Sequence, residues 1–282
     1  MDSRRHILIP IDFSEQSLLA LEQSYSMARM TNSEITLLHI ILENNPFWGI
    51  FNAEEKEEAV EKFHKKLQDF AEVVSKKSGI RVNTIVEKGK LIDKIIEVSE
   101  RMNTRFLIVG TIVKDNFKEK IIGTNASKLV REAKCPLITI KGNKTTGDTK
   151  KIVLPLDLSK ETNQKVTQAV QLARYFKSTI YVVSVATTKD SHLVARMTSQ
   201  MEQVRKHINK QGLDCETDFI KVGASNASVA KQLQDYAYGI DADLMIIMTQ
   251  QEDAISEHFV GSTAKEIINN SEIPVMSIAP KS

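Results

Sequence analysis

The chain has 282 residues, of which 26% are charged and 41% hydrophobic, which predicts a folded globular protein and argues against a disordered one. Its length is typical of two domains. The 38 Lys and Arg residues nearly balance the 36 Asp and Glu residues, and a net charge of +2 lacks the positive field that most nucleic-acid binders carry. The sequence therefore predicts no nucleic-acid partner.

Cysteine content and hydropathy predict a cytoplasmic protein. Cys135 and Cys215 are too few for a disulfide framework and have no metal-ligand spacing, so no metal site is expected. The first apolar run is interrupted by Pro10 and Asp12, which leaves it too short for the core of a signal peptide. No stretch approaches the roughly 18 apolar residues of a membrane span. We expect no membrane partner.

In the first half of the chain, short β-branched runs alternate with amphipathic helical patterns. Ser14 has the character of a helix cap, with apolar residues following at a spacing of three or four. A second amphipathic pattern, from Glu54 to Phe70, is interpreted as a solvated helix. Strands that are apolar nearly throughout predict a parallel sheet with helices on both faces. The predicted strands are 6–11, 35–40, 82–86, 105–109 and 137–140.

The second half of the chain repeats the first. The segment 151–159 repeats 6–14, and 180–185 repeats 35–40, in both cases 145 residues later. Towards the ends of the two copies this distance shortens to 138 residues. A period of this length is too long for a solenoid and predicts two similar domains.

The predicted architecture is α/β, with two similar doubly wound domains at 1–142 and 148–282. Each is expected to contain a mainly five-stranded parallel sheet with helices on both faces, and a polar, glycine-containing linker separates them. In such sheets, ligands bind beyond the carboxyl ends of the strands, where the strand order reverses.

Several residues are predicted to gather at that edge of the sheet. Asp12, like Asp157 in the second copy, follows the first strand and could accept from a ribose hydroxyl or an exocyclic amine. On spacing alone, a turn or a helix cap is the favoured interpretation of this aspartate. His39 lies in the second strand, where a packed residue is favoured over a ligand. Thr124 and Asn125 open a helix behind a glycine, which suits either an anion site or an ordinary cap.

Together these features resemble the universal stress protein family in a tandem arrangement, over essentially the whole chain. The family's nucleotide motif is Gly-x2-Gly-x9-Gly-Ser/Thr. The first copy matches it at Gly110, Gly123 and Thr124 but has Val113 at the middle glycine. The second copy keeps only its last element. Further likeness comes from Pro10-Ile-Asp12-Phe-Ser14, Leu38-His39-Ile40 and the Cys135-Pro136 run.

The resemblance implies an adenine nucleotide, ATP or another, as cofactor in the first domain. In the family, the aspartate after strand one and the end of strand two hold adenine and ribose, and the glycine loop with its hydroxyl takes the phosphates. With Val113 at the middle glycine, the first loop must change its shape or lose part of its phosphate-binding backbone. Glycine permits φ > 0 and close backbone approach, and a β-branched residue does not. The candidate nucleotide-binding residues are Pro10, Asp12, Ile40, Gly110, Val113, Gly123, Thr124 and Asn125.

The two copies differ in the charge of the loop after the fourth strand. The segment 111–122 has three lysines and two acidic residues, and 249–260 has three acidic residues and no Lys or Arg. A triphosphate is repelled by the second of these loops. We therefore expect any nucleotide to bind the first copy.

Three functions are compatible with the sequence. The leading one is a cytoplasmic, non-catalytic stress-response protein that binds an adenine nucleotide in its N-terminal domain. The alternative is a nucleotide-free interaction or scaffold protein with both sites degenerate. A slow ATPase or nucleotidyl enzyme is the third, and is least favoured because no catalytic nucleophile or acid–base pair is recognised. The resemblance also implies an intramolecular pseudo-dimer of the two domains through strands 137–140 and 275–278, with a homodimer as a further option.

Overall fold

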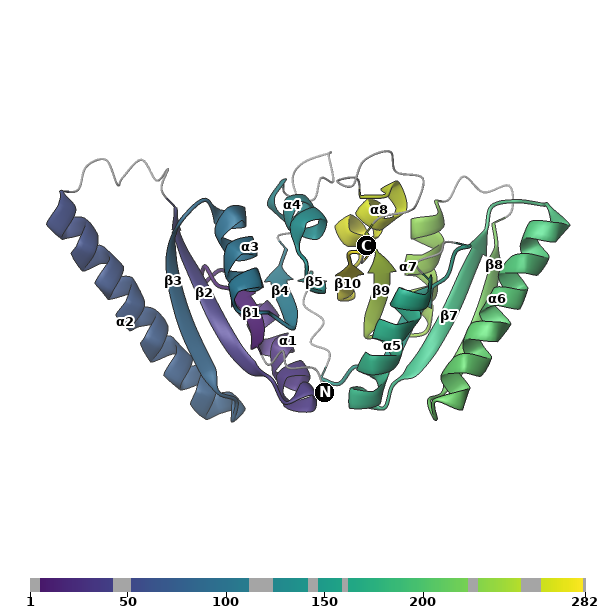
Figure 1. Cartoon of the computed structure of the whole chain (residues 1–282), viewed down its shortest axis with the longest axis horizontal. Coiled ribbons are helices and arrows are strands. Elements are labelled where there is room, and N and C mark those ends of the chain that lie inside the picture. The colour runs from purple at the N-terminus through teal and green to yellow at the C-terminus, as the bar shows by residue number, and fades with distance from the viewer. Residues whose placement is uncertain are drawn as a thin grey trace. The chain divides into compact units, whose positions relative to one another are not determined.

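A computed structural model of the chain describes residues 6–42, 52–111, 124–141, 147–158, 162–222, 228–249 and 260–280. The described residues divide into two compact units, the first ending at Ile138 and the second beginning at Thr139. The first unit contains the first copy of the sequence repeat up to Ile138, and the second unit contains the second copy (Figure 1). The domain boundaries 1–142 and 148–282 stay a prediction, because most of the linker between them lies outside the described residues.

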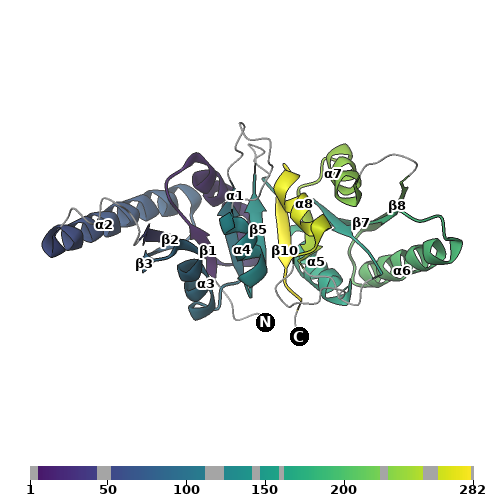
Figure 2. The same cartoon turned by 90° about the horizontal axis from the view of Figure 1, so that it is seen from above.

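The first half is a doubly wound α/β domain. Its strands have the order β3-β2-β1-β4-β5. Helices α1 and α2 cover one face of the sheet, and α3 and α4 cover the other (Figure 2). The elements are β1 (His6–Pro10), α1 (Glu15–Thr31), β2 (Glu34–Leu42), α2 (Ala53–Ser78), β3 (Val82–Gly89), α3 (Leu91–Arg101), β4 (Phe106–Gly110), α4 (Thr124–Glu132) and β5 (Leu137–Ile140).

The second half repeats this architecture, with the strand order β10-β9-β6-β7-β8. Helices α5 and α6 lie on one face of its sheet, and α7 and α8 lie on the other (Figure 2). The elements are β6 (Lys151–Pro155), α5 (Thr162–Phe176), β7 (Thr179–Ala186), α6 (Ser191–Lys210), β8 (Cys215–Lys221), α7 (Val229–Gly239), β9 (Leu244–Met248), α8 (Ser262–Asn270) and β10 (Val275–Ile278). The predicted pair of doubly wound α/β domains is confirmed.

The central strand decides where a ligand can bind. β1 pairs in parallel with β2 on one side and β4 on the other, so Ile7 lies opposite both Ile35 and Phe106. Ile7, Leu8 and Ile9 are fully buried because helices cover both faces of this strand. The strand order reverses here, and the crevice of the first half is therefore expected at the carboxyl ends of β1 and β4. In the second half the same place is at β6 and β9.

The predicted strands of the first half agree with the observed ones to within three residues at each end. The largest differences are that β2 continues to Leu42 and β3 to Gly89, where 40 and 86 were expected. These strands pair with each other along their whole length, up to Leu42 opposite Gly89, and this pairing extends both.

The predicted start of the first helix is also observed. Ser14 is the N-cap of α1, and its hydroxyl accepts from the backbone of Ser17 at 3.3 Å. The amphipathic stretch predicted from Glu54 to Phe70 lies inside α2, which begins with a capping box between Asn52 and Glu55. Leu67 of α2 is buried against the sheet.

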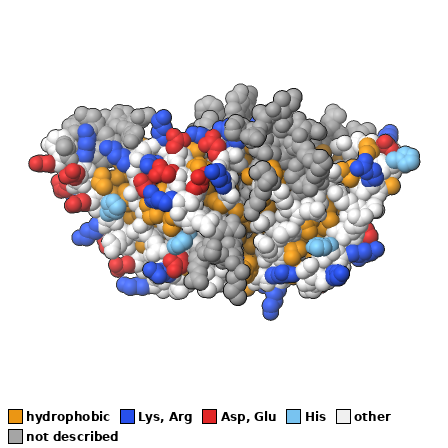
Figure 3. Space-filling view, viewed as in Figure 1, with side chains coloured by type: hydrophobic (Ala, Val, Ile, Leu, Met, Phe, Trp, Pro, Cys, Tyr) orange, Lys and Arg blue, Asp and Glu red, His pale blue; other side chains and the backbone are white. Residues whose placement is uncertain are grey.

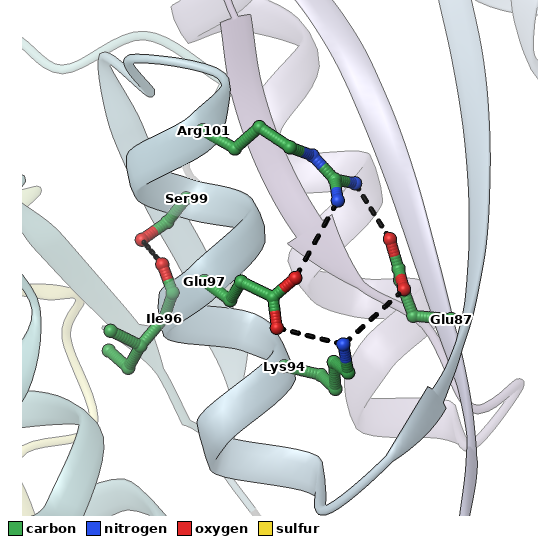
Figure 4. Close-up of polar contacts among 6 residues, drawn as sticks. All are labelled: Glu87, Lys94, Ile96, Glu97, Ser99 and Arg101. Carbon is green, nitrogen blue, oxygen red and sulfur yellow. Dashed lines mark hydrogen bonds and ion pairs between the residues drawn. The ribbon is translucent and has the colours of Figure 1, made fainter.

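A charge network joins α3 to the end of β3 (Figure 4). Arg101 donates to Glu87 Oε1 at 2.7 Å, and the Lys94 ammonium lies 3.7 Å from the other oxygen of the same carboxylate. Glu97 accepts from Lys94 at 2.8 Å. These side chains are 21–51% exposed, so each ion pair is expected to contribute little stability, and together the pairs connect α3 to the end of β3.

Charges of both signs are interspersed on the face of the first half that Figure 3 shows. The described side chains on this face form no extended basic patch, in line with the balanced composition. None of the helices within the described ranges combines the length and the apolar character that crossing a bilayer requires.

Candidate functional site

The turn after β1 presents Asp12 at the carboxyl edge of the first sheet. Ile11 continues the strand pairing by donating to the Leu38 carbonyl at 2.8 Å, and the exposed Asp12 follows. The backbone and hydroxyl of Ser14 donate to Asp12 Oδ1 at 3.0 and 2.6 Å. Asp12 thus orients the serine that caps α1, which agrees with the favoured turn interpretation. A carboxylate oxygen has capacity for further donors, so a ligand group can also bind here.

The same hydrogen bonds affect the ionisation of Asp12. Partial burial by itself raises the pKa of this carboxyl, but the bonds from Ser14 and Ser17 lower it more, and the pKa lies below its usual value. Asp12 is therefore a charged acceptor at neutral pH.

Gly110 brings the end of β4 against the first turn of α1. A Cβ added at this position would lie 2.1 Å from the Gln16 carbonyl oxygen and 3.0 Å from the Ser17 nitrogen. Only glycine permits this approach of the two backbones. Gly110 therefore places the end of β4 against the first turn of α1, close to the Asp12 turn.

The other candidate residues vary in how fully they are described. Pro10 is half-buried as the last residue of β1. Ile40 is 8% exposed and lies two residues before the end of β2, because this strand is longer than predicted. Val113 and Gly123 lie outside the described residues.

Thr124 and Asn125 are the first two residues of α4, where the sequence predicted a helix to begin; their side chains are outside the described part of the chain. The first turn of a helix has backbone N–H groups without partners within the helix. Such a turn is suited to bind an anion.

An aromatic cluster lies beside the Asp12 turn, and the sequence interpretation missed it. The His39 ring stacks on Phe63 with centroids 5.0 Å apart, and Phe13 packs edge-on against Phe70 at 5.5 Å. The Lys66 ammonium lies 4.7 Å from the centre of the Phe13 ring. His39 is a packed residue, as predicted. The sequence feature that could have predicted the cluster is the helical spacing of Phe63 and Phe70.

Comparison with known proteins identifies the family. The model of the universal stress protein family matches residues 3–141 and 148–278. The chain belongs to the universal stress protein family. The double match makes it a tandem member, with two universal stress protein domains in one chain.

Individual universal stress proteins are distant in sequence. Universal stress protein MJ0531 of Methanocaldococcus jannaschii is 25% identical over 148 residues, which cover 49% of this chain and 82% of the relative. The crystal structure of a universal stress protein from Archaeoglobus fulgidus covers 98% of this chain and 97% of its own, with 20% identity and a TM-score of 0.78. At 20% identity, this likeness shows that the two chains share a fold. A second Archaeoglobus fulgidus universal stress protein, solved in complex with dAMP, is 23% identical over 47% of this chain and 98% of its own, with a TM-score of 0.38.

The second universal stress protein domain differs from the first at the corresponding edge. The Lys165 ammonium of α5 lies 3.8 Å from Asp157 Oδ1, and the lysine side chain is 4% exposed. The equivalent of Lys165 in the first domain, 145 residues earlier, is the fully buried Ala20. The sequence interpretation missed this lysine, although it lies on the buried side of α5 with Ala169 and Phe176. A cation therefore accompanies the aspartate of the second domain.

The glycine of the first domain is also replaced. Met248 ends β9 at the position equivalent to Gly110. A residue with a side chain cannot make the backbone approach that Gly110 makes, so α5 cannot lie against β9 as α1 lies against β4. Within the described part of the chain, no three His, Cys, Asp or Glu residues are grouped so that they could bind a metal ion.

Replacing Gly110 by alanine is expected to lower the free energy of unfolding by at least about 2 kcal/mol, because the added methyl group overlaps the α1 backbone. Gly239→Ala is the matched control, since an added Cβ there meets nothing within 4 Å. It should change stability by less than about 1 kcal/mol. Urea unfolding of both variants checks this, and equal stabilities would contradict the close approach.

Two substitutions, Lys165→Met and Lys165→Ala, distinguish the contribution of the aliphatic stem of this lysine to stability from that of its charge. Methionine keeps a chain of similar length, and the partner Asp157 is 43% exposed and can be solvated. The alanine variant is expected to be less stable than the methionine variant by about 2–3 kcal/mol, because it loses the packing of the stem. Thermal and urea unfolding measure the difference. If both variants lost the same stability, the ammonium rather than the stem would be the stabilising part.

Proposed function

We propose that the first domain binds an adenine nucleotide, ATP in the first instance, at the carboxyl ends of β1 and β4. The observation that supports this most directly is the approach of Gly110 to the first turn of α1, where an added Cβ would lie 2.1 Å from the Gln16 oxygen. It brings the end of β4 and the first turn of α1, which follows Asp12, together at the reversal of strand order, the place where ligands bind in doubly wound sheets.

The proposed roles follow from the chemistry of each residue. The Asp12 carboxylate accepts from a ribose hydroxyl or the exocyclic amine, with Pro10 and Ile40 beside it. The phosphates extend along the backbone from Gly110 through Val113 and Gly123. They end at Thr124 and Asn125, where the N-terminus of α4 favours negative charge.

The second domain is proposed not to bind nucleotide. Asp157 already has the Lys165 ammonium 3.8 Å from its Oδ1. Met248 stands where the first domain has Gly110, and three acidic residues in the segment 249–260 repel phosphate. On this proposal, the first domain contains a nucleotide site and the second domain contains a degenerate copy of it.

For the whole chain we propose a cytoplasmic stress-response protein without catalytic activity, in which nucleotide binding serves regulation. The described residues include no cluster suited to bind a metal ion, and the sequence has no catalytic signature. The pairing of the two domains through 137–140 and 275–278 stays a prediction, as does a homodimer.

Calorimetric titration of ATP into Asp12→Ala and Asp157→Ala tests the assignment. Binding should be lost in the first variant and unchanged in the second, because only the first domain offers a free site. Asp12→Asn is the matched variant, since its amide oxygen can still accept from Ser14 while the charge and one acceptor oxygen are removed. Loss of binding in Asp157→Ala alone would move the site to the second domain.

Mass spectrometry of the small molecules that the purified protein releases on denaturation is a direct second measurement. An empty protein that also fails to bind added nucleotide would favour the scaffold function.

Val113→Gly is expected to strengthen ATP binding several-fold. If the loop must adopt φ > 0 to bind, glycine relieves about 1–3 kcal/mol of strain and adds about 1 kcal/mol of loop entropy at most. Each 1.4 kcal/mol of the net gain is about tenfold in affinity. Gln251→Gly, the equivalent change in the second domain, should give no gain. An unchanged affinity in Val113→Gly would mean that the loop serves something other than a nucleotide.

A further inference from the structure

His39 contacts the chain on both sides of Asp12. Its Nδ1 donates to the Ile11 carbonyl, the residue before the aspartate, at 2.8 Å. A carbonyl can only accept, so the proton of this bond is on Nδ1. The same ring lies 6.0 Å from the ring of Phe13, the residue after the aspartate.

Phe13 needs such support. Its φ is +63°, a left-handed conformation that a bulky residue adopts only where its surroundings enforce it. His39 and Phe70 contact its ring, with centroids 6.0 and 5.5 Å away. The direction of the Asp12 side chain therefore depends on a backbone that packing holds in place.

The second domain contains the same hydrogen bond with a different side chain. Ser184, which is 145 residues after His39, donates from its buried hydroxyl to the Leu156 carbonyl at 3.0 Å. Leu156 precedes Asp157 as Ile11 precedes Asp12. A donor from the second strand thus binds the carbonyl before the aspartate in both copies, although the two donor side chains differ in size and shape. Only histidine adds a ring for the residue that follows, and the equivalent of Phe13 is Leu158, which is 36% exposed.

We infer that His39 is a positioning residue for Asp12: it fixes the carbonyl before the aspartate and the ring after it, and so directs the carboxylate to the nucleotide. The nucleotide part of this inference rests on the proposed function. The effect of His39 on Asp12 is independent of the proposed function, and it can be measured without a ligand.

Two substitutions divide the role of His39. His39→Phe keeps a ring against Phe13 and Phe63 but removes the donor to Ile11. His39→Asn keeps a donor near the position of Nδ1 but removes the ring. Ser184→Ala is the matched control, since it deletes the equivalent bond in the other domain.

The first readout is the titration of the Asp12 carboxyl by NMR in each full-length variant. The pKa of Asp12 should rise towards its ordinary value in His39→Phe, because the turn that aligns the Ser14 donors is released, and it should rise less in His39→Asn. It should not change in Ser184→Ala. A merely structural role would lower the stability of His39→Phe and Ser184→Ala alike and leave the Asp12 titration unmoved.

The second readout is ATP affinity by calorimetry. His39→Phe should bind about fivefold more weakly, the size expected for one hydrogen bond, with His39→Asn closer to the wild type and Ser184→Ala equal to it. An unchanged Asp12 titration in His39→Phe would overturn the inference whether or not affinity changes. If the wild-type protein bound no ATP, the proposed function would fail, and the Asp12 titration would still decide the role of His39.

Discussion

The burial of the central strand on both faces is the constraint on which each half depends. Ile7, Leu8 and Ile9 of β1 are fully buried, and so are Ile152, Val153 and Leu154 of β6. A strand with apolar side chains on both faces requires helices above and below it, and right-handed crossovers supply them only if the chain moves outward in both directions from that strand. The reversal of strand order, and with it the position of the proposed site, follows from this burial.

Backbone contacts at the carboxyl edge then give the site its local form. Gly110 lets the end of β4 meet the first turn of α1, and Ser14 caps that helix while donating to Asp12. His39 contacts the residues before and after the aspartate from the neighbouring strand. The bond from Ser14 to Asp12 is local, whereas the contacts of Gly110 and His39 join segments that are distant in the sequence. The geometry of the turn therefore depends on the assembled sheet as well as on the local sequence.

The two halves have the same backbone fold but different side chains at the carboxyl edge of the sheet. The strand order, the aspartate after the first strand and a donor to the preceding carbonyl are the same in both. The side chains around them have diverged: Ala20 corresponds to Lys165, and Gly110 corresponds to Met248. A buried lysine next to the aspartate changes the charge of the second edge, and a methionine removes the close approach of the helix. Divergence at few positions therefore changes the charge and the backbone packing of an edge while the strand order stays the same.

The sequence by itself determined the fold, the duplication and the family. Continuous apolar runs such as 6–11 and 105–109, together with the repeat of 6–14 at 151–159, carry that information locally. It also placed Asp12, Gly110 and the start of α4 at one edge, because parallel strands end on the same side. Only the tertiary structure showed that Gly110 fits against Gln16, that His39 binds the Ile11 carbonyl and that Lys165 reaches Asp157. The physical reason is that periodicity tells which side of an element is buried, whereas these contacts depend on the separation and direction of elements that meet only when the sheet is assembled.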